Sequence, residues 1–552
     1  MSLITISQVN CKDCYKCVRY CPVKAIRVVN GHAEVVPERC LGDGSCIQVC
    51  PQQAKHVRND DDIVRNLLAG DAPVMASVAP SVAGVYGTEL PQLLAALKQM
   101  GFARVEETAR TAAAVARAHA ELAAQGKSVI TTSCPAVVSL VEKYYPHLRP
   151  MLAPVPSPMV AHARLLREEY GPETGVVFIG PCVAKKGEVA QDEINAALTF
   201  DELNSWLDEE MPDWHSLAGA EFDNAPVGTA ELFPLLNGLI KTAGLPDDNM
   251  NEALLTVAGL PEVRQLFDEL PTLEGVHLIE ALACAGGCLQ GPGAICGPEP
   301  WTRRKQLLAH ARPGEELSCP ANMSCTFTDP PLNLLVPTEE EIAAILRRTG
   351  KHTPTDEQNC GACGYNSCRE KAIAVIQGMA EAEMCIPYMR SRAESFANVV
   401  IRNTPNGIIV VDSQLRVLDI NPAFTHMFNC LATEVIGRPL KSVFDPAAFA
   451  RVKRTGKPFS RTEVKYGDMI ASEMVFPVAD EGIIIGIYIN INEEVLRQQK
   501  QLNVKSETLG KARQVIDKQM RVAQEIAGLL GETTAETKVL LTRLISLYDE
   551  EK

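Results

Sequence analysis

Closely spaced cysteines constrain this chain more than any other feature. The sequence has 19 of them in 552 residues, and most stand in short runs. In a long chain such runs indicate metal ligands, whereas disulfides predominate in small secreted domains. The length also exceeds what one hydrophobic core normally serves, so the runs are expected to mark separate domains.

The overall charge restricts the classes of partner. A formal net charge of -15 and a pI near 5.3 would repel nucleic acid and anionic membranes. The N-terminal residues show no basic segment followed by an apolar run, and no uninterrupted apolar stretch approaches the ~18 residues of a membrane span. We therefore expect a cytoplasmic protein that binds neither nucleic acid nor membrane.

Two cysteine runs, each ending in a Cys-Pro pair, occupy residues 1–60. Their members are Cys11, Cys14, Cys17 and Cys21, followed by Cys40, Cys46 and Cys50. The CxxCxxCxxxCP spacing resembles that of bacterial two-cluster ferredoxins, in which the last cysteine of each run crosses to the other cluster. The resemblance implies that Cys50 completes the first cluster and Cys21 the second.

The second run departs from this pattern at one position. Asp43 stands where a fourth cysteine is expected. A carboxylate binds iron less softly than a thiolate, so the site could hold a 4Fe-4S cluster with Asp43 or water as a ligand, or a 3Fe-4S cluster. Either form would conduct electrons.

Residues 71–312 alternate between strand-like and helix-like segments, which predicts an α/β domain. The strand-like segments are PVMASVAP, SVITTS, GVVFIG and VHLIEALAC, and helix-like segments include LPQLLAALKQMGF and TAAAVARAHAELAAQ. Cysteines follow the ends of three strands, at Cys134, Cys182, Cys284 and Cys288. Four thiolates suffice to hold one cubane cluster.

The segments TTSCP, PCVAKKGE and EALACAGGC resemble, in order, the three signature segments of iron-iron hydrogenases. In that family a 4Fe-4S cluster is bridged through one cysteine to a two-iron unit that carries CO, cyanide and a dithiolate amine. The resemblance implies that the four cysteines hold the cubane and that Cys288 bridges to the two-iron unit.

The same resemblance assigns the polar residues of the pocket. Lys185 would donate to a bound cyanide, a charge-assisted contact in a dry site, and Glu188 would balance its charge. Ala79, Pro80 and Ser81 match the family's alanine-proline-serine segment, in which Ser81 would donate to the second cyanide.

Several positions of the family's proton route differ in this chain. Ser133 replaces a cysteine that relays protons, and a hydroxyl is a much weaker acid than a thiol of pKa near ~8.5. Arg117 or Ala118 stands where relay carboxylates usually lie, which leaves Glu121 as the acid of that segment, and Ala153 replaces a relay hydroxyl. Gly180 and Leu282 replace methionines near the two-iron unit. Slow turnover is expected.

Another cysteine set follows a connector at 313–352. Cys360, Cys363, Cys368 and Cys385, within residues 353–392, resemble the small 4Fe-4S module of corrinoid proteins and sensory hydrogenases. Its position after the hydrogenase-like domain predicts an electron exit. Four cysteines stay without an assigned role: Cys296, Cys319, Cys325 and Cys430.

The C-terminal part resembles a signalling module. Residues 393–494, with NPAF and IGRPL segments, resemble a PAS domain. In 495–552 a heptad seam of Leu502, Leu509, Ile516, Ala523 and Leu530 predicts either a dimeric coiled coil or a helical hairpin, and residues 533–536 form a capping box for a second helix. No histidine follows residue 495, so the chain has no phosphoacceptor of its own there.

The expected fold is multidomain, α+β and α/β: a ferredoxin-like domain, a hydrogenase-like domain, a 4Fe-4S module, a PAS domain and C-terminal helices. We expect about three 4Fe-4S clusters in addition to the active-site cubane and the two-iron unit. The favoured hypothesis is a sensory hydrogenase acting on H2 and protons, with ferredoxin as redox partner, a separate kinase or phosphatase as target, and a homodimer. The alternatives are a catalytic ferredoxin-linked subunit and a redox sensor without the two-iron unit.

Overall fold

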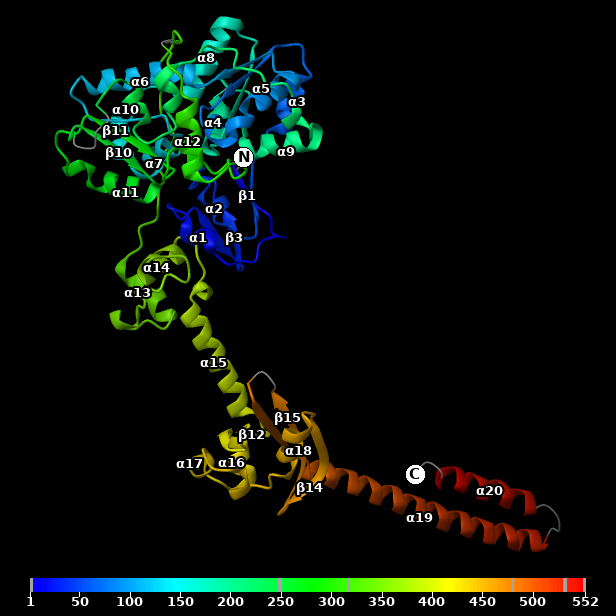
Figure 1. Cartoon of the computed structure of the whole chain (residues 1–552). Helices are drawn as coiled ribbons and strands as arrows, with labels where there is room; N and C mark the ends of the chain where they lie inside the picture. The colour runs from blue at the N-terminus through cyan, green and yellow to red at the C-terminus, as the bar shows by residue number, and fades with distance from the viewer. Residues whose placement is uncertain are drawn as a thin grey trace. The chain divides into compact units, whose positions relative to one another are not determined.

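The computed structural model describes residues 3–191, 193–246, 251–314, 318–478, 481–529 and 534–549. The chain divides into two compact units, Met1–Met389 and Arg390–Lys552 (Figure 1). Among the described residues, no helix has the length and apolar character that a membrane span requires.

The N-terminal residues form a small domain of the ferredoxin type. Strand β1 (Ile4–Ile6) pairs antiparallel with β4 (Lys55–Val57), and β2 (Ile26–Val29) pairs with β3 (His32–Val35). The short helices α1 (Lys16–Tyr20) and α2 (Ser45–Gln48) each carry one cysteine of a run. The chain thus repeats one cysteine loop and one short helix.

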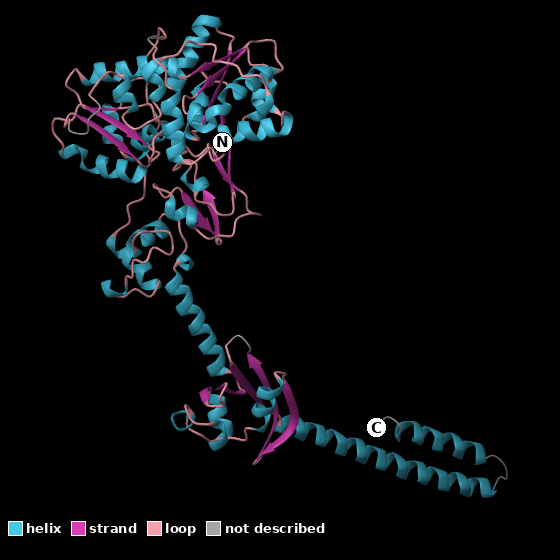
Figure 2. Cartoon of the chain, in the orientation of Figure 1, coloured by secondary structure: helices cyan, strands magenta, loops and turns pink. Residues whose placement is uncertain are grey.

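The central domain contains two parallel sheets, with helices between the strands (Figure 2). The four-stranded sheet has the order β6-β5-β8-β9, formed by β6 (Arg104–Glu107), β5 (Val74–Val78), β8 (Gly175–Gly180) and β9 (Ala196–Thr199). The three-stranded sheet has the order β10-β11-β7, formed by β10 (Leu254–Ala258), β11 (Leu278–Leu282) and β7 (Val129–Ile130). The four predicted strands are therefore present as β5, β7, β8 and β11.

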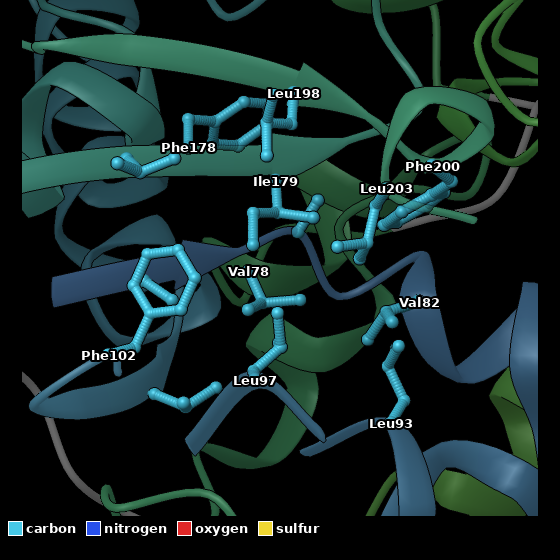
Figure 3. Packing of buried hydrophobic residues seen from close by; sticks show 14 of the residues in the cluster. Val78, Val82, Leu93, Leu97, Phe102, Phe178, Ile179, Leu198, Phe200 and Leu203 are labelled. Carbon is cyan, nitrogen blue, oxygen red and sulfur yellow. The ribbon is translucent and has the colours of Figure 1, made fainter. Parts of the chain in front are cut away.

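Helices cover these sheets because the strands are apolar on both faces, as parallel strands usually are. All five side chains of β5 are buried, and Val78, Ile179, Leu97 and Phe102 pack together in the core (Figure 3). The helices are α3 (Asp61–Leu68), α4 (Val82–Tyr86), α5 (Leu90–Gln99), α6 (Ala109–Ala123), α7 (Pro135–Tyr144), α8 (Pro158–Tyr170), α9 (Phe200–Glu210), α10 (Gly238–Thr242), α11 (Leu260–Glu269) and α12 (Pro300–His310). Both predicted helices are confirmed, as α5 and α6.

The module around residue 360 is largely helical. Helix α13 (Glu339–Arg348) begins with a capping box between Thr338 and Glu341. Helix α14 (Cys368–Ile376) is capped by Ser367, whose side chain accepts a hydrogen bond from the amide of Glu370. Helix α15 (Ile386–Asn403) follows and runs across the division between the two units.

The second unit contains a PAS fold, an antiparallel sheet of order β13-β12-β16-β15-β14. Its strands and helices are β12 (Gly407–Asp412), β13 (Val417–Ile420), β14 (Phe459–Tyr466), β15 (Met469–Val478), β16 (Ile483–Asn490), α16 (Pro422–Phe428), α17 (Ala432–Val435) and α18 (Ala447–Thr455). Aromatic rings fill part of the interior: Phe424, Phe428, Phe444, Tyr466 and Tyr488. Inside this cluster, the Tyr488 hydroxyl donates to the buried Glu473 carboxylate at 2.9 Å.

Two helices end the chain, α19 (Asn492–Leu529) and α20 (Thr534–Asp549), and they lie side by side (Figure 1). The intramolecular hairpin is therefore the arrangement present. Leu509, Ile516 and Ala523 of the predicted seam are partly covered, whereas Leu502 is exposed. Leu530 and Thr533, the first residue of the predicted capping box, lie outside the described residues.

Candidate active site and iron-sulfur sites

Four cysteines of the central domain meet in one pocket. Cys134 follows β7 and precedes α7, Cys182 follows β8, and Cys284 and Cys288 follow β11. The pocket they line also contains Ser133, Lys185, Leu282 and Asp43. Parallel strands bring their carboxyl ends to the same edge of a sheet, so three distant sequence segments converge here.

The four cysteines of this pocket are half-buried, and their thiols lie close to one another. Burial and the neighbouring thiols raise the pKa of Cys182 to about 11 and that of Cys288 to about 12. Burial also raises the pKa of Cys134 and Cys284, the latter with Cys182, Cys134 and Cys288 as charged neighbours. Thiols with raised pKa values stay protonated unless a cation stabilises the thiolate form. Iron ions would do so, and four thiolates are the ligands of a cubane cluster, so the donor set fits such a cluster.

Lys185 is not a solvated surface lysine. Its side chain is 13% exposed, and its Nζ lies 3.1 Å from Oε2 of Glu188. The hydroxyl of Ser157 donates to the same carboxylate oxygen at 3.1 Å. The ammonium thus lines the same pocket as Cys288 and is paired with a carboxylate. That Lys185 donates to a small anionic ligand stays a prediction.

Two buried hydroxyls, one of them in this pocket, have no hydrogen-bond partner among the described residues. Their oxygens are the Oγ atoms of Ser133 and Ser81. Buried hydroxyls without partners are costly, and both could donate to polar ligands of a bound group. Ser133 lines the pocket, whereas Pro80 and Ser81 are not among its described lining residues. They follow β5, the strand that pairs with β8, the strand before Cys182.

His119 on α6 is a buried histidine that sequence reasoning missed, and it contacts Thr132, the neighbour of the pocket residue Ser133. Its Nδ1 donates to the carbonyl of Val115 at 2.8 Å, so Nε2 accepts from the Thr132 amide at 3.2 Å. Burial lowers the pKa of His119 to about 4, and the imidazole stays neutral. Arg117 and Glu121, the residues considered from sequence, are exposed. The only signal was a lone histidine in an alanine-rich helix, one position beyond Ala118.

The fixed neutral state of His119 has a consequence for stability. Its pKa lies below the ~6.5 of an unfolded histidine, so the unfolded chain takes up the proton first as the pH falls. The stabilisation is complete above pH ~6.5 and is lost toward pH 4, by about 2 kcal/mol between pH 7.5 and 5. Urea midpoints at both pH values should therefore differ more for the native sequence than for His119→Leu. Equal pH dependence in the two proteins would contradict this assignment.

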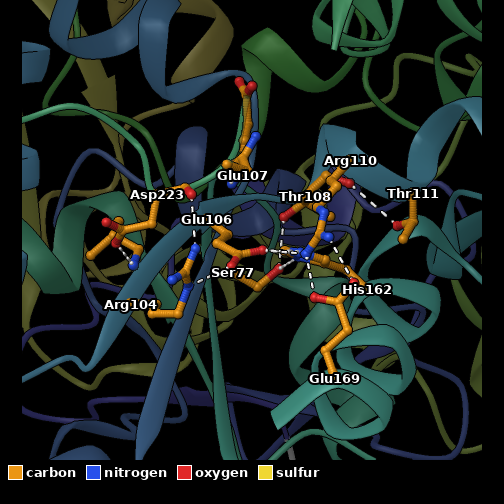
Figure 4. A network of polar contacts seen from close by, with 12 residues as sticks. Ser77, Arg104, Glu106, Glu107, Thr108, Arg110, Thr111, His162, Glu169 and Asp223 are labelled. Carbon is orange, nitrogen blue, oxygen red and sulfur yellow. Dashed lines mark hydrogen bonds and ion pairs between the residues drawn. The ribbon is translucent and has the colours of Figure 1, made fainter. Parts of the chain in front are cut away.

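A network of polar side chains surrounds Glu106 on β6 (Figure 4). Glu106 accepts from Arg104 at 2.9 Å and from Arg110 at 2.8 Å, and Arg110 also pairs with Glu169 on α8. Although burial opposes it, the nearby His162 and the hydrogen-bonded Arg104 and Arg110 lower the pKa of Glu106 to about 2. This network joins β6, α6 and α8 and has a structural role.

Asp43 lies with the cysteines that the ferredoxin resemblance groups with it. The charges of Asp43 and Cys40 act on Cys21, and those of Asp43, Cys21 and Cys40 act on Cys46. Burial raises the pKa of Asp43, whose carboxylate accepts hydrogen bonds from the amide and hydroxyl of Ser45. The structure therefore brings three thiols and one carboxyl together at the second site.

The other ferredoxin site is more open. Cys14 is exposed, Cys17 is buried, and the charge of Cys11 acts on Cys17. The amide of Ala54 donates to Sγ of Cys50 at 3.4 Å. That Cys50 completes this cluster stays a prediction.

In the C-terminal module, Cys363 and Cys385 are electrostatic neighbours. The buried Lys351 donates to Sγ of Cys385 at 3.4 Å. Among the described residues, no group of histidine, cysteine and acidic side chains is arranged to hold a single metal ion.

Comparison with known protein families separates the chain into four matched regions. Residues 72–292 match the family described as iron only hydrogenase large subunit, C-terminal domain. Residues 3–51 match a 4Fe-4S dicluster domain, residues 357–387 an Fe-S cluster family, and residues 401–491 a PAS fold. The fold and sites thus define an iron-sulfur protein of several domains.

More particularly, the protein combines an iron-only hydrogenase large-subunit domain with ferredoxin-type, Fe-S and PAS domains. It is 25% identical over 325 residues to the NADP-reducing hydrogenase subunit HndD of Solidesulfovibrio fructosivorans, covering 46% of this chain and 55% of that protein. The chain therefore spans about half the length of this relative.

Two further comparisons concern other hydrogenases. The periplasmic Fe hydrogenase large subunit of Nitratidesulfovibrio vulgaris is 26% identical over 369 residues, covering 53% of this chain and 86% of that protein. A solved structure of a variant of the FeFe-hydrogenase HydA1 from Chlamydomonas reinhardtii has a TM-score of 0.39 at 17% identity, covering 49% of this chain and 100% of that one.

Proposed function

We propose that this protein is a sensory iron-iron hydrogenase that detects hydrogen or redox state and turns over slowly. The observation that carries the proposal is the four-cysteine pocket with its Lys185–Glu188 pair, in a chain that also contains a PAS fold. Cys134, Cys182, Cys284 and Cys288 would hold the cubane, and Cys288 would bridge to the two-iron unit. When bound, that unit would supply the reversible conversion of H2 into protons and electrons.

The other polar residues would hold the bound group in place or supply protons to it, and they would not react themselves. Lys185 would hold a cyanide through its ammonium, with Glu188 fixing the Nζ position. Ser133 and Ser81 would donate their unpaired hydroxyls to polar atoms of the bound group. Proton supply is weak because Ser133 is a poor acid and burial keeps His119 neutral.

The other clusters would connect this pocket to the signalling part. The ferredoxin-type sites would bind one cluster through Cys11, Cys14, Cys17 and Cys50 and one through Cys21, Cys40, Asp43 and Cys46. The module would bind a third through Cys360, Cys363, Cys368 and Cys385. A ferredoxin would exchange electrons with the chain, and a dimer formed by the PAS domain and terminal helices would act on a kinase or phosphatase.

Infrared spectroscopy of the matured protein tests this proposal most directly, because bound CO and cyanide absorb where protein does not. We expect their bands, together with hydrogen turnover far slower than that of catalytic hydrogenases. Absence of the bands would favour a redox sensor without the two-iron unit. Fast turnover would favour a catalytic ferredoxin-linked subunit.

Ser133→Cys should increase hydrogen evolution modestly. The substitution introduces a thiol into the pocket, but the neutral His119 still supplies no acidic proton. The gain should therefore stay well below the ~10²-fold that a positioned acid typically contributes. Hydrogen evolution by the matured variant and by the native protein provides the measurement, and Ser133→Ala serves as the control. Unchanged evolution in Ser133→Cys would show that another step limits the rate.

A further inference from the structure

The ferredoxin-type domain and the C-terminal module are docked against each other. Their buried side chains form one hydrophobic cluster that includes Val18 and Tyr365. The amide of Val28 donates to the carbonyl of Met379 at 3.0 Å, which joins the backbones of the two domains. The carboxylate of Glu381 in the module accepts from the amide of Gly31 at 3.0 Å. The contact is therefore specific.

The closest approach occurs beside one cysteine of the module. Gly364 follows Cys363 and has a φ of +93°. A Cβ atom at Gly364 would lie 3.1 Å from Cγ1 of Val18 and 3.2 Å from the backbone nitrogen of Arg19. Both the backbone conformation and the space therefore require glycine. Val18 lies on the helix that ends just before Cys21.

Lys24 ties the two domains together at the same place. Its Nζ donates to the carbonyls of Arg19 at 2.9 Å and Val18 at 3.1 Å on one side, and to that of Gly364 at 2.9 Å on the other. The ammonium also lies 5.8 Å from the ring of Tyr365. Cys21 and Cys363 both act electrostatically on Lys24. One cation thus contacts the backbones of both domains.

A cavity of about 610 Å³ at this contact is rich in positive charge. Arg19, Lys24, Arg39 and Arg264 are among its lining residues, beside Cys21 and Tyr365. Tyr365 is 3% exposed, and charges of both Cys363 and Cys21 act on it. Clusters ligated by thiolates are anionic, so cations between two of them reduce the repulsion when both are reduced.

The same ferredoxin-type site also faces the active-site pocket. Asp43 is one of the residues that line the pocket, and its charge acts on Cys284. A Cβ atom at the adjacent Gly44 would collide with Pro292, another lining residue. The site formed by Cys21, Cys40, Asp43 and Cys46 therefore lies against both the active-site pocket and the C-terminal module.

We propose that electrons from the active-site pocket pass through the site formed by Cys21, Cys40, Asp43 and Cys46 to the C-terminal module. They would cross between the two domains at the contact that Lys24 and Gly364 position. This inference rests on the proposed function for its clusters. Each step moves one electron: the donor cluster is oxidised by one unit and the acceptor cluster is reduced by one unit, with no bond formed or broken.

Electron paramagnetic resonance of the chemically reduced, cluster-loaded full chain tests the contact without using hydrogen. In the native protein we expect a spin interaction between the module cluster and the cluster of Cys46. Gly364→Leu should abolish this interaction. Gly378→Leu is the matched control, because Gly378 also has a positive φ of +69° but a Cβ there meets nothing within 4 Å. Lys24→Met is a second variant expected to weaken the interaction.

Two cysteine variants identify the partner cluster. Cys46→Ala should remove the interaction, whereas Cys14→Ala should keep it. Iron and sulfide analysis verifies that the module cluster is still present in each variant. An interaction that survives Cys46→Ala or Gly364→Leu, or that disappears in Cys14→Ala, would overturn the proposal. Since dithionite supplies the electrons, these outcomes do not depend on whether the pocket processes hydrogen.

Discussion

Lys185→Met should decrease the infrared bands of bound CO and cyanide by about tenfold to hundredfold in the matured protein. The ammonium of Lys185 is nearly buried, lines the four-cysteine pocket and is oriented by Glu188 at 3.1 Å. A charge-assisted hydrogen bond in such a place contributes about 1.5–3 kcal/mol, and methionine fills a similar volume without a donor. The cubane cysteines are unchanged, so iron for that cluster should be retained.

The controls separate loss of the donor from loss of charge balance. Lys185→Met leaves Glu188 with Ser157 as its hydrogen-bond donor. The double variant Lys185→Met/Glu188→Gln also removes the leftover negative charge, and we expect the bands to stay weak. Recovery of the bands in the double variant would show that the single variant loses them because the Glu188 carboxylate is unpaired, and not because the Lys185 donor is missing. Unchanged bands in Lys185→Met would contradict the assigned role.

Lys186→Met should destabilise the first unit by about 3 kcal/mol, because it leaves the largely buried Glu202 without its cation, whereas Asp60 keeps its ion pair with Arg58. Lys186 is fully buried, and its Nζ donates to the carbonyl of Ala197. It also lies 3.0 Å from Glu202 on α9 and 3.7 Å from Asp60, which precedes α3. The two acids come from segments far apart in the sequence, so the lysine joins α3 to the edge of the sheet.

We expect the cluster-loaded Lys186→Met variant to unfold at a lower urea concentration than the native protein, and the urea midpoint measures this loss of stability. Lys185→Met is the matched control, since the two lysines are adjacent in sequence and the substitution is the same. We expect its midpoint to change much less, because Lys185 lines the pocket and pairs with a carboxylate that keeps Ser157. Equal urea midpoints for the two variants would show that the ion pairs of the buried Lys186 do not stabilise the first unit as predicted.

The two lysines also show where sequence reasoning ends. The PCVAKKGE segment resembles a hydrogenase signature, and the spacing from Lys185 to Glu188 suits a pair on one short turn. Nothing in the sequence distinguishes the environment of Lys186, because Asp60 and Glu202 are distant along the chain. Similarly, Ala118 and His119 are neighbours on one helix, and only the direction of α6 decides that His119 points to Thr132.

The sequence by itself predicted which residues bear chemistry and in what order the domains follow, since ligand spacing and strand and helix periodicity are local properties. It predicted the roles of the four pocket cysteines, Asp43, Lys185 with Glu188 and the module cysteines, and it predicted the PAS fold, which the family comparison confirms. The tertiary structure alone decided which sites face one another. Asp43 lines the active-site pocket and Gly364 packs against Val18 because long-range packing, which spacing does not encode, places these segments in contact.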